Sequence, residues 1–319
     1  MTKRILITGA GGFVGSYLIK ELQKDKNNEI YGSVYKSSSD ITNLLPSDHI
    51  LAGDLTDLKV AQLHIQSAKP DVIYHLAALS VVHNSTQNAL VTMQGNTAIS
   101  YNLFEAIHTH ASHARTMAIC SANVYGAVPA LSIPISENTP FRPLNPYAVS
   151  KITQEMIALQ AHLSYGLDVV ILRPFNHSGP GQTQDFVLPK LARQIVEIEL
   201  ESKLPVLELG SGSSIRDFTD VRDMVKAYVM AEKSCLTGET YNIGSGVGTS
   251  IRAVADIFAS YSKKPFKIIE KPELTRHSDV PSLVANVNKF KELTGYFPLI
   301  SLERTISDIL EYERNNYHE

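Results

Sequence analysis

Short apolar runs rich in β-branched residues alternate with longer amphipathic stretches along the first half of the chain. Runs of this kind are typical of strands that are buried on both faces of a sheet. The predicted strands are Arg4–Thr8, Glu29–Val34, His49–Ala52, Val72–Leu76, Thr116–Cys120 and Asp168–Leu172. Helices are predicted between them, including one from Pro146 to about Tyr165. The alternation predicts an α/β fold with a doubly wound parallel sheet, with ligands at the carboxyl ends of the strands.

The second half of the chain departs from this regular alternation. A turn-rich segment at residues 174–181 precedes a predicted helix over Phe186–Glu199 and a predicted strand at Val206–Leu209. A helix at Val221–Lys233 and a strand at Thr240–Ile243 have the pattern of a unit that returns to the main sheet. With 319 residues, 44% of them hydrophobic, one large domain with a smaller attached lobe fits as well as two independent domains.

A glycine-rich turn follows the first predicted strand. Gly9, Gly12 and Gly15 lie where this strand leads into an amphipathic helix. The absence of side chains there lets backbone amides and the helix N-terminus approach a pyrophosphate. With a strand before it and a helix after it, the motif predicts a dinucleotide site, and a purely structural turn is the alternative.

The residues after the second and third predicted strands bear on which dinucleotide binds. NAD enzymes place an acidic residue after the second strand, whereas this chain has Lys36 and Ser37. A cation with hydroxyl donors suits a 2′-phosphate, so NADPH is the predicted cofactor, NADH stays open, and a polar connecting loop is the alternative reading. Asp54, after the third strand, can accept from the adenine amino group or cap the next helix.

The main candidate for acid–base chemistry is the stretch from Asn145 to Lys151. Tyr147 and Lys151 are four residues apart, so they share one face of a helix that starts near Pro146. A lysine ammonium beside a phenol favours the phenolate, which would lower the pKa of the tyrosine and improve it as a proton donor and acceptor. An isolated pair of this spacing is more often an ordinary surface pair, so the rest of the chain has to supply the context.

Charge and cysteine content exclude several functional classes. The net charge is −3 and no basic block occurs, which argues against nucleic-acid binding. No apolar run approaches the roughly 18 residues of a membrane span. Cys120 and Cys235 are isolated and have no metal-like spacing. We therefore expect a cytoplasmic protein that binds neither membranes nor a metal ion.

Five ordered motifs resemble those of the extended short-chain dehydrogenases/reductases that act on nucleotide sugars. They are Thr8–Gly15, Gly53–Leu55, Ser121–Gly126, Tyr147 with Lys151, and Arg173–Asn176, and the C-terminal segments Tyr241–Gly246 and Arg276–Asp279 also look like that family. The resemblance implies an NAD(P)-binding Rossmann domain from residues 1–174 plus 217–244. It implies a smaller mixed α/β sugar-nucleotide lobe from residues 175–216 plus 245–319.

The resemblance also implies roles for individual residues. Ser121, Tyr147 and Lys151 match the family's catalytic Ser–Tyr–Lys set, in which serine binds the reacting oxygen, tyrosine transfers a proton and lysine holds the nicotinamide ribose. The residues expected to contact the cofactor are Gly9, Gly12, Phe13, Val14, Gly15, Lys36, Ser37, Asp54, Leu55, Leu76, Ala77, Ala78, Asn96, Tyr147, Lys151 and Pro174. Those expected to contact the substrate are Ser80, Ser121, Ala122, Asn123, Tyr147, Asn176, Val187, Lys190, Arg193, Arg216, Arg276 and Asp279. Asn96 matches a family position whose role is structural more than catalytic, and the arginines suit a diphosphate.

The residues after Ser121 discriminate between reactions. Dehydratases of this family have a glutamate two residues after the catalytic serine or threonine, and the corresponding residue here is Asn123, which cannot act as a general base. Phe175–Gln182 and Asp185–Lys190 nevertheless look most like the GDP-mannose dehydratase branch. The resemblance therefore implies reduction by NADPH of the C4 ketone of GDP-4-keto-6-deoxy-D-mannose to GDP-D-rhamnose, by a homodimer.

Two alternatives stay open at this point. A UDP-sugar 4-epimerase with tightly bound NAD would use the same Ser–Tyr–Lys set, and a non-catalytic NADP-sensing protein would keep the fold. His83 and His177 are interpreted as hydrogen-bonded loop histidines and not as catalytic bases.

Overall fold

The computed structural model describes residues 2–35, 41–79, 88–275 and 280–317. Five of the predicted site residues lie outside this part of the chain, namely Lys36, Ser37, Ser80, Arg276 and Asp279.

The main sheet has seven strands, all parallel, in the order β10-β6-β5-β4-β1-β2-β3. Its strands are β1 (Lys3–Thr8), β2 (Asn28–Val34), β3 (Ile50–Ala52), β4 (Val72–His75), β5 (Arg115–Ile119), β6 (Val169–Pro174) and β10 (Thr240–Ile243). β1 and β6 lie inside the sheet and are buried at most positions, as expected of continuous apolar runs with helices on both faces. The predicted doubly wound parallel sheet is confirmed, and the strand predicted at Thr240–Ile243 joins its edge.

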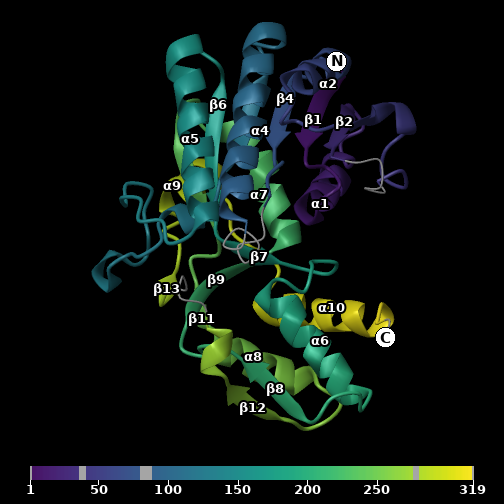
Figure 1. Cartoon of the computed structure of the whole chain (residues 1–319), viewed down its shortest axis with the longest axis vertical. Coiled ribbons are helices and arrows are strands. Elements are labelled where there is room, and N and C mark those ends of the chain that lie inside the picture. Colours follow the sequence, from purple (N-terminus) through teal and green to yellow (C-terminus); the bar gives the residue numbers. More distant parts are fainter. Residues whose placement is uncertain (1, 36–40, 80–87, 276–279, 318–319) are drawn as a thin grey trace.

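Helices cover both faces of this sheet (Figure 1). One face is covered by α1 (Phe13–Leu22) and α7 (Val221–Ser234), the other by α2 (Leu58–Ala68), α4 (Ala89–His110) and α5 (Pro146–Tyr165). Each face has its own apolar core, because each helix buries one stripe of side chains against the strands. Figure 1 shows α4 and α5 side by side along the sheet.

A smaller lobe lies below the carboxyl ends of these strands in Figure 1. A mixed sheet contains β7 (Asn176–Ser178), β9 (Ile215–Asp220), β11 (Gly248–Ser250) and β13 (Ser282–Leu283), while β8 (Val206–Leu209) pairs in parallel with β12 (Lys267–Glu270). The lobe's own apolar core is formed by α6 (Val187–Glu199), α8 (Ile251–Tyr261) and α10 (Leu302–Asn315) with these strands. The predicted smaller mixed α/β unit is confirmed as part of the fold class.

The chain crosses between the two sheets more often than the predicted domain division suggests. Phe290 of α9 (Asn288–Thr294) and Tyr296 pack into the core of the main sheet, although the division assigns them to the lobe. Conversely, β9 begins before residue 217 and pairs only within the mixed sheet. The division at residues 174, 217 and 244 therefore stays a proposal.

The described part of the chain also holds four short 3₁₀ turns, namely η1 (Ser47–His49), η2 (Ala122–Val124), η3 (Ala130–Ser132) and η4 (Pro272–Leu274). Within the described residues, no helix combines the length and the apolar character that crossing a membrane would require.

Candidate active site

The N-terminus of α5 carries the predicted acid–base pair. Asn145 caps the helix because its Oδ1 accepts from the amide of Ala148 at 2.8 Å, and Pro146 occupies the first turn. This fixes the start of the helix at the carboxyl end of the sheet. Tyr147 and Lys151 are then 8% and 3% exposed on the same inward face, so the alternative of a surface pair is wrong.

Ser121 follows β5 and lies beside this helix. It is 7% exposed, and its Oγ accepts from the backbone amide of Asn123 at 3.1 Å and from the Asn123 side-chain amide at 3.2 Å. Hydrogen bonding from Ser121 also acts on the phenol of Tyr147. The loop thus brings the Ser121 hydroxyl and the Tyr147 phenol together, with Asn123 supporting the serine.

Lys151 makes different contacts from those expected of it. Its Nζ donates to the backbone oxygen of Ile119 at 2.9 Å and to Oε1 of Gln154 at 2.8 Å, and it lies 6.0 Å from the centre of the Tyr147 ring. Burial lowers the pKa of Lys151 to about 8, because an ammonium is poorly solvated there.

The expected lowering of the tyrosine pKa by the lysine is wrong for the chain by itself. Burial raises the pKa of Tyr147 to about 12, hydrogen bonding from Ser121 opposes this rise, and Cys120 adds to it. The reason is geometric, since the Lys151 ammonium is directed toward the carbonyl of Ile119 and not toward the phenol oxygen. At neutral pH Tyr147 is therefore a protonated phenol, which is the state that a proton donor needs.

The glycine-rich turn has the shape that a dinucleotide requires. Gly9 has a φ of +71°, and a Cβ on it would come within 2.9 Å of the Ala77 amide nitrogen. A Cβ on Gly15 would come within 2.6 Å of the Gly9 carbonyl oxygen, so α1 can only pack this close to the strand without a side chain there. Gly12 precedes α1 and supplies no capping side chain, and the first turn of α1 holds no acidic residue. These features fit a pyrophosphate at the helix N-terminus, near Phe13 and Val14.

Other predicted cofactor residues surround the same strand ends. Leu76, Ala77 and Ala78 follow β4, and the amides of Leu76 and Ala77 both bond Thr8 at the end of β1. Asp54 accepts from the Thr56 amide at 2.9 Å. The cap of α2 is Asp57, so the alternative role of Asp54 as the helix cap is wrong.

Asn96 and the remaining members of the predicted cofactor set differ in what they contact. Asn96 is 1% exposed and bonds both backbone groups of Leu79 and the Ser150 hydroxyl, so it joins α4, the segment after β4 and α5. Leu55 and Pro174 are buried behind the strand ends. The contacts of Asn96 favour a structural role over direct contact with a cofactor.

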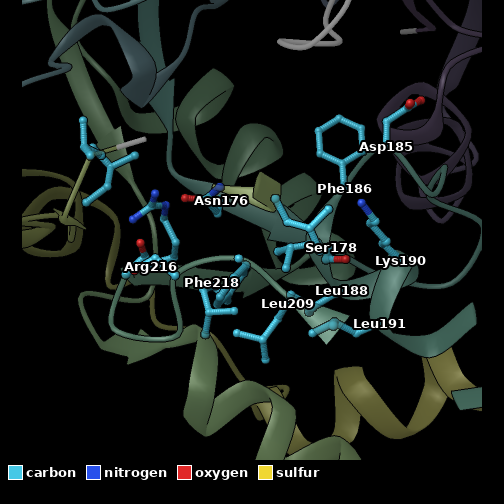
Figure 2. Close-up of a pocket in the computed structure, with 18 of the residues that line it drawn as sticks. Asn176, Ser178, Asp185, Phe186, Leu188, Lys190, Leu191, Leu209, Arg216 and Phe218 are labelled. Carbon is cyan, nitrogen blue, oxygen red and sulfur yellow. The ribbon is translucent and has the colours of Figure 1, made fainter. Parts of the chain in front are cut away.

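A pocket of about 260 Å³ opens between these strand ends and the smaller lobe. Asn123 and Asn145 line it from the catalytic side, and the predicted substrate residues Asn176, Val187, Lys190 and Arg216 line it from the lobe. Figure 2 shows Asn176 and Arg216 toward one end of the pocket and Asp185, Phe186 and Lys190 toward the other. Leu209 lies along the apolar side with Leu188, Leu191 and Phe218.

Comparison with known proteins identifies the family. The family model for GDP-mannose 4,6 dehydratase matches residues 6–309. The chain belongs to this family. It is a short-chain dehydrogenase/reductase, an NAD(P)-dependent enzyme that acts on nucleotide sugars.

Individual relatives carry more than one activity. The chain is 31% identical to the GDP-6-deoxy-D-mannose reductase of Pseudomonas aeruginosa over 97% of both chains. It is also 31% identical to an uncharacterized UDP-glucose epimerase of Bacillus subtilis, over 98% of this chain and 99% of the relative. A solved structure of RMD from Pseudomonas aeruginosa complexed with NADPH has a TM-score of 0.87 and 29% identity, and covers 99% of this chain and 100% of its own.

Within this family fold, four of the predicted substrate residues that the structure describes lie outside the pocket lining, namely Ser121, Ala122, Tyr147 and Arg193. Arg193 lies on α6 outside the pocket lining, where its Nε donates to Glu197 at 3.3 Å and its guanidinium stacks 3.6 Å from the Tyr317 ring centre. Helical spacing alone would put Arg193 near the face that carries Lys190, three residues earlier. Its guanidinium instead turns to Tyr317, which follows the C-terminal helix α10. Ala122 is 1% exposed and packs beneath the serine loop.

Several lining residues escaped the sequence-based reasoning. They are His177, Ser178, Gln182, Phe186, Ser214 and Phe218. The turn-rich segment at residues 174–181 was the available signal, but its short strand β7 forms only by pairing with β9 about forty residues later. The Nδ1–H of His177 donates to the Phe175 backbone oxygen at 3.0 Å, and burial lowers the pKa of His177, in keeping with a hydrogen-bonded neutral histidine.

Proposed function

We propose that this family member reduces the C4 ketone of GDP-4-keto-6-deoxy-D-mannose to GDP-D-rhamnose with NADPH. The observation that carries the proposal is the Asn123 side chain, which donates to Ser121 where a dehydratase of this family has its carboxylate base. An amide in this place supports the serine hydroxyl and cannot remove a carbon-bound proton. The similarity to the Pseudomonas aeruginosa reductase points the same way.

The proposed catalytic roles follow from which side chains can donate a hydrogen to the C4 oxygen of the sugar. When bound, the nicotinamide supplies the hydride that the C4 carbon accepts. Tyr147 gives its phenolic proton to the C4 oxygen, so that the ketone becomes an alcohol and the O–H bond of the tyrosine breaks. Ser121 donates a hydrogen bond to the same oxygen as negative charge develops on it. Lys151 acts on the remaining phenolate only through its charge at a distance, since its Nζ donates to Ile119 and Gln154, and solvent protons restore the phenol.

The pocket would hold the nucleotide part of the substrate. Arg216 and Asn176 lie together at one end, and a guanidinium fork matches a diphosphate. Phe186 is 36% exposed, so its ring can stack on a base while Lys190 lies one helical turn away. We also propose that the enzyme works as a homodimer in the cytoplasm, with α4 and α5 at the interface. This is supported by exposed apolar residues on both helices, among them Leu90, Val91 and Leu163.

The test is turnover of purified enzyme with NADPH and GDP-4-keto-6-deoxy-D-mannose, with the sugar product identified by NMR. We expect NADPH oxidation and GDP-D-rhamnose in equal amounts. Dehydration of GDP-mannose by the same preparation, or a product with the opposite configuration at C4, would contradict the proposal.

A 4-epimerase is the second candidate, because the UDP-glucose epimerase of Bacillus subtilis is as similar as the reductase. An epimerase needs no net reductant and retains its dinucleotide. Purified protein that carries NAD and interconverts UDP-hexoses without consuming NADPH would favour this candidate. A protein that binds NADPH but turns over neither substrate would favour the sensing alternative.

A further inference from the structure

A buried glutamine next to the catalytic lysine is not explained by the proposed reaction. Gln154 lies three residues after Lys151 on α5 and is 0% exposed. Its Oε1 accepts from Lys151 Nζ at 2.8 Å, and its Nε2 donates to the Ile119 oxygen at 3.2 Å. Because Lys151 Nζ also donates to the same oxygen at 2.9 Å, the three groups close a ring of hydrogen bonds.

This ring connects the catalytic lysine to the catalytic serine. Ile119 is the last residue of β5, two residues before Ser121. A fully buried primary amide loses its bonds to water, so it is retained only where protein groups replace them. Both hydrogen bonds that the described structure gives the Gln154 side chain are with Lys151 or with the end of this strand. We propose that Gln154 is a positioning residue that holds the Lys151 ammonium and sets its protonation.

No charged acceptor in the described part of the chain binds the Lys151 ammonium, so its protonation depends on neutral partners such as Gln154. Both acceptors of the Lys151 ammonium in the described part of the chain are neutral, and burial lowers the pKa of Lys151 to about 8. An ammonium with neutral partners in a dry site depends strongly on each of them. Loss of the Gln154 oxygen would therefore lower the pKa of Lys151 further, and a carboxylate at the same place would raise it.

Cys120 raises the pKa of Lys151 against the effect of burial, and the other titratable groups around Lys151 are uncharged or paired near neutral pH. Tyr147 on the same helix has a raised pKa, burial raises the pKa of the Cys120 thiol just after β5, and burial lowers the pKa of His75 on β4 to about 3. All three are uncharged at neutral pH. Glu155 on α5 and Arg173 on β6 are charged but bind each other, with Arg173 Nε donating to Glu155 at 2.9 Å.

The experiment titrates Lys151 directly in two variants whose side chains are close in size to glutamine. Gln154→Met removes the oxygen acceptor, and Gln154→Glu replaces it with a carboxylate. Protein labelled with ¹³C at the lysine Cε is followed by NMR from pH 6 to 11, and the Lys151 signal is assigned by its loss in Lys151→Met. We expect the titration midpoint to fall in Gln154→Met and to rise by roughly one to three pH units in Gln154→Glu. Gln160→Glu is the matched control, because it makes the same change on an exposed position of α5 and should leave the midpoint in place.

Opposite shifts separate tuning from a structural role, because a glutamine that merely fills space would give two variants with the same midpoint. An unchanged midpoint in both folded variants would overturn the proposal. Should Gln154→Met fail to fold, the isosteric Gln154→Glu alone decides it by the presence or absence of an upward shift.

The catalytic consequence rests on the proposed function and is measured separately. The alkaline limb of kcat/KM for ketone reduction should move in the same direction as the NMR midpoint in each variant. NMR shifts without any turnover would contradict the proposed reaction and leave the role of Gln154 standing. Turnover in which neither the alkaline limb of kcat/KM nor the NMR midpoint shifts would support the proposed reaction and contradict the role of Gln154.

Discussion

The catalytic side and the nucleotide side of the pocket are built in different ways. Ser121, Tyr147 and Lys151 are each less than a tenth exposed, and they lie at the ends of β5 and α5, two regular elements of the main sheet. On the opposite side, Lys190 on α6 of the smaller lobe is exposed, and Phe186, just before that helix, is 36% exposed. Groups that transfer protons need a fixed, dry setting, whereas groups that bind a nucleotide can be ordered by it.

Buried ionic networks support both sides. Arg173 binds Glu155 and the Tyr125 hydroxyl, which in turn donates to Asn242 at 2.6 Å, so α5, the serine loop, β6 and β10 are tied together. In the lobe, Asp217 accepts from Ser245, Gly246 and Ala285, and it directly follows Arg216 of the pocket. Each network fixes the backbone from which a site residue projects, so the two sides differ in side-chain exposure more than in backbone support.

The largest expected effect is on the catalytic side. Tyr147→Phe removes the proton donor and should lower kcat by roughly 10²- to 10⁴-fold, because general acid catalysis contributes about that much. Binding of NADPH, measured by fluorescence titration, should stay within a few fold, since the ring remains in its buried place. Full activity in this variant would sink the assignment of Tyr147.

Ser121→Ala should have the next largest effect. Loss of one donor to the developing oxyanion raises the barrier by about 2.7–4 kcal/mol in enzymes with comparable stabilisation, which is roughly 10²- to 10³-fold in kcat. Single-turnover measurement with the keto sugar should show the loss in the chemical step. Ser121→Thr keeps the hydroxyl, and a loss as large as that of the alanine variant would argue against the hydrogen bond.

Lys151→Met separates stability from activity on the same side. The difference between the ordinary lysine pKa and about 8 corresponds to roughly 3 kcal/mol of unfavourable charge burial, partly offset by the lost hydrogen bonds. A lowered folded-state pKa means that this cost is full below about pH 8 and disappears as pH rises toward the unfolded-state value. Denaturant unfolding should therefore show the variant gaining stability at pH 7, with the gain shrinking between pH 8 and about 10.5. A gain independent of pH would show that packing causes it.

The smallest expected effect is that of Arg216→Met, on the nucleotide side of the pocket. Hydrogen bonds to charged groups contribute about 1.5–3 kcal/mol, so KM for the nucleotide sugar should rise roughly 10- to 100-fold with kcat less affected. Steady-state kinetics separates the two constants. Arg216→Lys keeps the positive charge without the paired guanidinium donors, so its KM should lie between those of the wild type and Arg216→Met. A loss confined to kcat would place Arg216 with the catalytic residues.

The sequence by itself determined the parts that depend on neighbours along the chain. Apolar runs predicted the strands of the main sheet to within a few residues, since their burial on both faces leaves a local pattern. The four-residue spacing of Tyr147 and Lys151, after the capping Asn145 and Pro146, placed both side chains on one face of α5.

Tertiary structure decided what each of these side chains contacts. Lys151 turns to Ile119 because the end of β5 lies beneath α5, and no local pattern encodes that approach. The pocket needs β7 and β9 to pair, α6 to lie over them, and Arg193 to turn away toward Tyr317 near the C-terminus. Such contacts join residues that are far apart in sequence, and their energies depend on burial, which exists only once the chain has folded.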